Sequence, residues 1–172
     1  MNANYQQDII YYEGLYESLL SYTEDDYNLL YFDPRESVNK VELEMIAGFT
    51  YRCLKCGILE GFRLDKLPNS TISNIESLAL HMSTYSFYEK FSNVDMEDLN
   101  MRVWFSEYYW ASDLTKELAE INNLTAYEDS WEPKKDLQWT NFKNQIEKTF
   151  LDYDIGWNQS DPILVIKQLQ GK

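Results

Sequence analysis

The spacing of apolar residues is the feature of this 172-residue chain that most limits what it can fold into. Apolar side chains recur at alternating spacings of three and four residues through most of the sequence, which is the period of a helix with one buried face. A half-buried strand would instead place them at every second position. We therefore expect an all-α fold, a single α-helical domain over residues 1–172 built as a bundle of about six helices.

The expected helices cover residues 3–21, 38–56, 73–90, 95–122, 133–152 and 162–169. A capping box at Ser73 and Glu76 suits the start of the third helix, although a start near Ser70 fits equally well. The last segment, ILVIKQLQ, is rich in β-branched residues and is compatible with a strand or a short irregular end. We predict a helix there, because a lone strand has no partner to pair with.

The segment 95–122 is apolar on two faces, which is typical of a helix buried at the centre of a bundle. One stripe contains Trp110, Leu114 and Ile121, and the opposite stripe contains Trp104 and Tyr108. We favour the central helix. The alternative is that one of the two stripes is an exposed aromatic patch for a partner or for a second copy of the chain.

Charge is concentrated in two parts of the sequence. The net charge is −14, of which −7 lies in residues 1–34 and −8 in residues 95–132. Such an acidic chain cannot neutralise phosphates, so direct nucleic-acid binding is not expected. If the two acidic blocks meet, they form a negative face that attracts a basic partner, and if they do not, they are two solvated helix surfaces.

No residue pattern in the chain indicates catalysis. Cys53 and Cys56 form a lone C-x-x-C, but both continue the apolar stripe of their helix, so we interpret them as core residues. His81, the single histidine, has no nucleophile motif beside it. The segment Asp152–Gly156 departs from a calcium loop at several positions. We therefore expect no enzymatic activity, no metal and no cofactor.

Aromatic residues accompany the first acidic block. Seven of the 14 tyrosines lie in residues 5–31 and are interleaved with acids, and tyrosine is enriched at protein interfaces. Tyr5, Tyr12 and Tyr16 are expected in the core. The predicted partner-binding residues are Tyr11, Glu13, Glu17, Tyr22, Glu24, Asp25, Asp26, Tyr27, Trp104, Glu107, Tyr108, Asp113 and Glu117.

The N-terminus has none of the features of a signal peptide, and no stretch is long and apolar enough to span a membrane. We therefore expect a cytoplasmic protein with no membrane partner. With its small size, acidity and tyrosine content, the chain resembles a bacterial immunity protein of a polymorphic or contact-dependent growth-inhibition toxin system. The resemblance implies a basic toxin domain, often a nuclease, that is neutralised by tight binding.

Two other classes of function stay open. A nucleic-acid mimic would use the same acids to occupy a DNA- or RNA-binding protein, with an affinity that falls more steeply with salt. A helical enzyme or small-ligand binder would need a pocket with a few convergent polar groups, for which His81, Cys53 and Glu76 are the first candidates.

Overall fold

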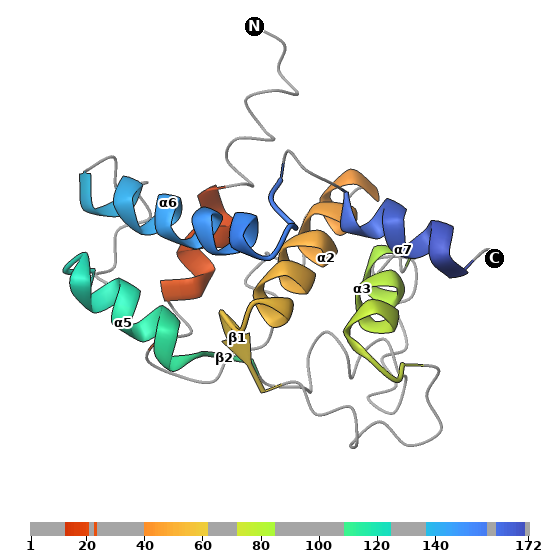
Figure 1. Ribbon diagram of the computed structural model, residues 1–172, viewed down its shortest axis with the longest axis horizontal. Helices are drawn as coiled ribbons and strands as arrows, with labels where there is room; N and C mark the ends of the chain where they lie inside the picture. The colour runs from red at the N-terminus through yellow and green to blue at the C-terminus, as the bar shows by residue number, and fades with distance from the viewer. Residues whose placement is uncertain are drawn as a thin grey trace, which may run out of the picture.

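The structure, a computed structural model, describes residues 13–20, 23, 40–61, 72–84, 109–124, 137–157 and 161–170. Within these ranges the fold is all-α, as the periodicity predicts, with a very small sheet added (Figure 1). The elements are a helix at residues 13–20, α2 (Lys40–Lys55), β1 (Leu59–Glu60), α3 (Ile75–Thr84), β2 (Trp110–Ala111), α5 (Asp113–Ile121), α6 (Leu137–Asp152) and α7 (Pro162–Gln170).

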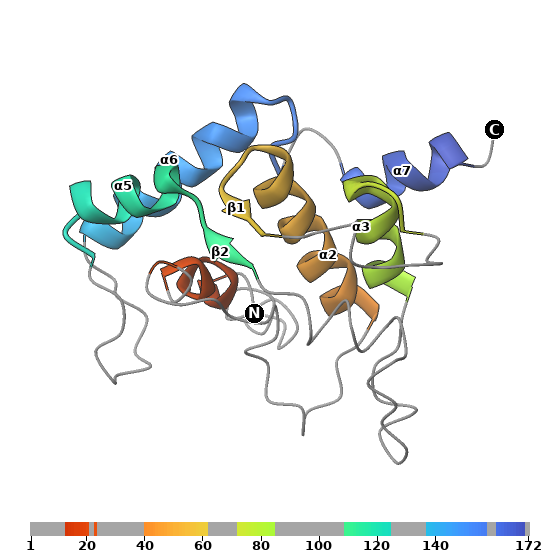
Figure 2. The same ribbon diagram turned by 90° about the horizontal axis from the view of Figure 1, so that it is seen from below.

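Helix α2 lies at the centre of the described part of the molecule. Helices α3 and α7 lie on one side of it, and α5, α6 and the helix at residues 13–20 lie on the other (Figures 1 and 2). Phe49 connects α2 to the helix at residues 13–20 and to α6. Its ring packs edge-on against Tyr16 and Phe150 at centroid distances of 5.2 and 6.1 Å. Burial of these large rings contributes apolar stabilisation to the packing of α2 against this side.

Helix α2 ends where the sequence places two glycines. Gly57 has a φ of +67°, a conformation that a residue without a Cβ adopts at little cost. The backbone N–H groups of Gly57 and Ile58 donate to the carbonyl oxygens of Leu54 and Cys53, which is the hydrogen-bond pattern of a Schellman motif. The turn directs the chain straight into β1.

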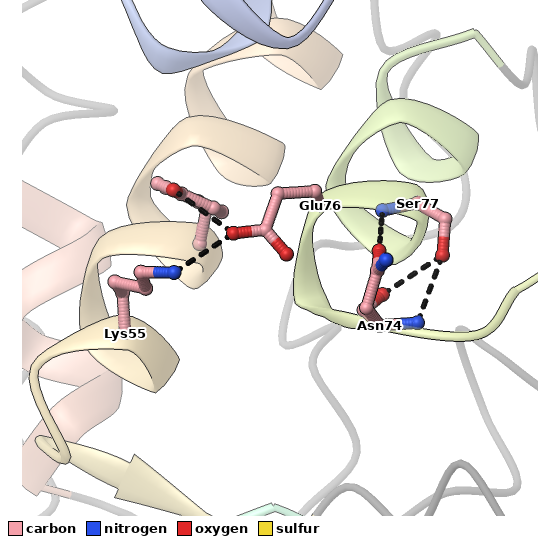
Figure 3. Close-up of polar contacts among 5 residues, drawn as sticks. Lys55, Asn74, Glu76 and Ser77 are labelled. Carbon is pink, nitrogen blue, oxygen red and sulfur yellow. Dashed lines mark hydrogen bonds and ion pairs between the residues drawn. The ribbon is translucent and has the colours of Figure 1, made fainter. Parts of the chain in front are cut away.

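The start of α3 corrects the expected capping box. The cap is Asn74, whose Oδ1 accepts from the backbone N–H of Ser77 at 2.7 Å, and Ser77 Oγ accepts from the N–H of Asn74 at 3.1 Å (Figure 3). These bonds satisfy the free donors of the first turn in place of the Ser73 and Glu76 pair. Glu76 instead reaches Lys55 on α2, at 2.8 Å.

The expected continuous helix over 95–122 is interrupted at residues 109–112, although residues 113–121 are helical as expected. Residues 109–111 are extended, and β2 pairs antiparallel with β1, Glu60 facing Trp110 and Leu59 facing Ala111. Ser112 then caps a new helix, α5, by accepting from the N–H of Thr115 at 3.3 Å. Residues 85–108, which hold the rest of the predicted helix, lie outside the described residues.

The last two helices agree with the sequence. The buried face of α6 contains Trp139, Phe142, Ile146 and Phe150, the predicted stripe, whereas Tyr153 is exposed. The segment after Pro162 is a helix, as predicted, and Asp161 caps it by accepting from the N–H groups of Ile163 and Leu164 at 2.9 and 3.3 Å. Among the described helices, none has the length and apolar content needed to cross a membrane.

Candidate functional site

Helix α5 carries the described part of the second acidic block, and its inner side is fixed by hydrogen bonds to the β1 region. The carbonyl oxygen of Ile58 accepts from the N–H of Ser112 at 3.1 Å and from the hydroxyl of Thr115 at 2.7 Å. Asn122, at the other end of α5, donates to Gln145 of α6 at 2.6 Å. These contacts at both ends determine which side of α5 faces outward.

The outer side of α5 is an acidic face, by which we mean Asp113, Glu117 and Glu120. Spacings of four and three residues place these acids in one row, and all three side chains are exposed. The buried residues Thr115 and Ala119 lie on the opposite side of the helix. Three unburied carboxylates on a fixed helix make a surface that attracts cations or a basic protein.

Two apolar side chains border this acidic face. Leu114 is 39% exposed and Ile121 is 61% exposed, although the sequence pattern places both in a buried stripe. Leu118, between them, is half-buried and packs against the core. The break at Ser112 explains the difference, because it starts a separate helix whose buried side is set by Thr115 and Ala119.

The first acidic block is described only in part. Glu13 is half-buried and makes contacts within the molecule: its carboxylate accepts from Trp139 Nε1 at 2.8 Å and forms an ion pair with Lys143, both on α6. This structural role was not foreseen from the sequence, which placed Glu13 on a contact surface. Glu17 is half-buried on the same helix.

Most of the predicted contact residues lie outside the described part of the chain. They are Tyr11, Tyr22, Glu24, Asp25, Asp26, Tyr27, Trp104, Glu107 and Tyr108. Asp113 and Glu117 are the predicted contact residues that the structure brings together on one exposed face. Glu120 was missed, although its position three residues after Glu117 is a signal that could have identified it.

The two cysteines lie in the core, as the sequence indicates. Both are buried and both are free thiols. Burial raises the pKa of Cys53 well above its usual value and raises the pKa of Cys56 to about 11. Because the thiolate is the nucleophile and the metal ligand, these values favour a packing role over redox or metal chemistry.

The other candidates for small-molecule chemistry are dispersed. His81 lies in the last turn of α3. Glu76, in its first turn, accepts from Lys55 Nζ of α2 at 2.8 Å (Figure 3). It also accepts from Tyr51 Oη of α2 at 3.4 Å. The hydrogen bond from Lys55 lowers the pKa of Glu76, and burial raises the pKa of Tyr51. In the described part of the chain, no three His, Cys, Asp or Glu side chains are grouped as metal ligands.

Comparisons with known proteins give no relative: no family model, no curated protein and no solved structure matches this chain.

Proposed function

We propose that this protein is a cytoplasmic inhibitor that binds and neutralises a basic protein, and that it is not an enzyme. The proposed target is the toxic domain of a bacterial toxin, with a nuclease domain as the best fit to the charge. This proposal follows the profile of an immunity protein: a small, acidic and tyrosine-rich chain without a catalytic motif.

The acidic face of α5 is the observation that carries the proposal. Asp113, Glu117 and Glu120 are exposed together, on a helix whose inner side is fixed by Thr115 and Asn122. Carboxylates in such a position speed association with a basic surface and add to its specificity. A nuclease needs cationic residues to hold phosphates, so its active cleft is a surface of this kind.

The net charge of −14 supports the same function at longer range. Charges separated by more than a Debye length, about 10 Å at 0.1 M salt, are largely screened. Steering by the whole chain therefore depends on salt, whereas contacts made directly by α5 persist better once the surfaces meet. Both effects are expected in an inhibitor that must reach its target quickly and remain bound.

The experiment compares two charge-reversal variants with the same change in net charge. Glu117→Lys with Glu120→Lys alters the acidic face, and Glu60→Lys with Asp152→Lys alters exposed acids on β1 and α6. Wild type and both variants are used to capture proteins from a lysate of the source cell at low and moderate salt. Captured proteins are identified by mass spectrometry, and each candidate is then purified and titrated against all three.

The proposal expects one basic protein whose activity is inhibited by the wild type and by the Glu60 and Asp152 variant. The Glu117 and Glu120 variant should bind it at least about tenfold more weakly, which corresponds to about 1.4 kcal/mol. Binding of that protein with equal affinity by all three would contradict a role for α5. Binding without inhibition would contradict the inhibitor function.

A further inference from the structure

We infer that the part of the partner that contacts α5 is an amphipathic basic helix. This partner helix lies along a seam, by which we mean Leu114, Leu118 and Ile121 of α5. This inference rests on the proposed function, because it names the element of the basic partner that contacts the same helix. The seam lies between the acidic face and the buried side of α5.

The apolar residues of the seam have the spacing of a helix-packing surface. Leu114, Leu118 and Ile121 are separated by four and three residues, and the first and last are 39% and 61% exposed. Seven residues of helix extend about 10.5 Å, so the seam runs for two turns. Exposed apolar side chains aligned along one side of a helix are the pattern that amphipathic partners recognise.

A helical partner fits this spacing because two helices that cross at a small angle repeat their contacts every three and four residues. Side chains of one helix then enter the spaces between side chains of the other, over several turns. Leu114 and Ile121 provide the outer contacts of such a seam. Leu118 provides a half-buried floor between them that is already packed against the core.

The charges beside the seam select a basic partner. Glu117 follows Leu114 by three residues and precedes Ile121 by four, so its carboxylate borders the seam, and Asp113 and Glu120 lie just beyond it. Lysine and arginine side chains flanking the apolar residues of a partner helix would meet these acids, with their stems covering apolar surface. A second copy of this chain would bring like charges together, which disfavours self-association here.

The test uses two synthetic peptides of about three heptads with identical leucine and lysine composition. In the patterned peptide the leucines occupy one helix face, with lysines beside them. In the scrambled peptide the leucines are spread around the helix. Binding of each peptide to the full-length chain is measured by fluorescence anisotropy, for wild type and for the variants Ile121→Ser and Leu137→Ser. Leu137 is a matched control because it is an exposed apolar residue on α6, 72% exposed.

The inference expects wild type to bind the patterned peptide at least about tenfold more tightly than the scrambled one, a factor that corresponds to about 1.4 kcal/mol. Ile121→Ser should remove most of this preference, and Leu137→Ser should retain it. Neither substitution changes the net charge, so a difference between them reports on the seam alone.

Equal affinity for the two peptides would overturn the inference, and so would an equal loss of preference in both variants. The proposed function would still stand if both peptides bound more weakly to the Glu117 and Glu120 reversal than to the Glu60 and Asp152 reversal. The proposed function fails by a different result: the basic protein purified from the source cell binds the variant with Glu117→Lys and Glu120→Lys as tightly as it binds wild type.

Discussion

At the residue scale, buried polar side chains connect segments that are distant in sequence. Arg52 is 2% exposed, and its Nε donates to the carbonyl oxygen of Ile155 at 2.7 Å while its guanidinium lies 3.9 Å from the ring centroid of Trp157. Trp157 in turn donates to the hydroxyl of Tyr16 at 2.9 Å. A buried charge is tolerated only where its hydrogen bonds and neighbours replace water, as they do here.

Replacing Arg52 tests this arrangement. Arg52→Met keeps much of the apolar volume but removes a part-buried donor to Ile155 and a buried donor to the carbonyl oxygen of Gly48. Loss of a partner by a buried acceptor costs about 1–3 kcal/mol. We expect the free energy of unfolding to fall by about that amount in urea denaturation. Lys148→Met, at an exposed position of α6, is the control and should change little. Equal stability of the two variants would contradict a structural role for the guanidinium.

The pair of Lys55 and Glu76 predicts a pH effect. The hydrogen bond from Lys55 holds the pKa of Glu76 below its usual value. The contact therefore stabilises the fold above the unfolded pKa of Glu76, and this contribution is lost as the pH falls through the lower native pKa. Lys55→Met should raise the pKa of Glu76 in an NMR titration of its side chain, whereas Lys148→Met should leave it in place. A pKa that does not move in Lys55→Met would disprove the assignment.

The thiols provide a third residue-level prediction. With the pKa of Cys56 at about 11 and that of Cys53 also raised by burial, few thiolates exist near neutral pH. Iodoacetamide at pH 8 should therefore modify the native protein slowly and the urea-unfolded protein rapidly, as followed by mass spectrometry. Rapid modification of the native protein would instead indicate an accessible, reactive site.

At the scale of elements, periodicity predicts helices well where one contiguous face is buried. It identified α2 and α6 to within a few residues, because Phe49 and Phe142 belong to regular buried stripes. Helix α7 was expected on another ground, since a lone strand in its place would have had no partner. Periodicity failed at residues 109–112, where the same apolar spacing continues but the backbone pairs with β1, about fifty residues earlier. Local spacing carries no information about such a distant partner.

The cap of α3 is a second difference between the expected and the observed helix start, and it concerns two neighbouring residues. Both Ser73 and Asn74 are good cap residues. From the sequence, a cap at Ser73 with Glu76 at the right distance and a start near Ser70 fitted equally well. The structure uses Asn74, which leaves Glu76 available to α2. Candidate site residues were predicted less completely than helices, since exposure depends on how a helix is rotated: Ile121 was expected to be buried and is exposed.

Two substitutions distinguish the caps. Asn74→Ala should lower the free energy of unfolding by about 1 kcal/mol, the usual effect of losing an N-cap. Ser73→Ala should have a much smaller effect. The backbone N–H of Ser73 donates to Ser77 Oγ at 2.9 Å, and alanine retains this N–H. Thermal and urea unfolding of both variants would measure the difference, and a larger loss in Ser73→Ala would contradict the observed cap.

At the scale of the whole molecule, an acidic surplus is combined with a helix, α5, that exposes three of the 29 acids on one side. The charge of −14 alone would be compatible with mere solubility. The arrangement on α5 is more specific, since Asp113, Glu117 and Glu120 share one exposed side with Leu114 and Ile121 at its border. A surface with both charge and apolar area can provide fast association and a slow release.

The most direct test of this account is the association rate of the chain with its purified basic partner, measured by stopped flow over a range of ionic strength. For wild type and for the variant with Glu60→Lys and Asp152→Lys, we predict fast association that slows steeply with salt. For Glu117→Lys with Glu120→Lys, we predict a slower rate and a shallower salt dependence. Identical rates and slopes for the two charge-matched variants would contradict the claim that α5 is the binding surface.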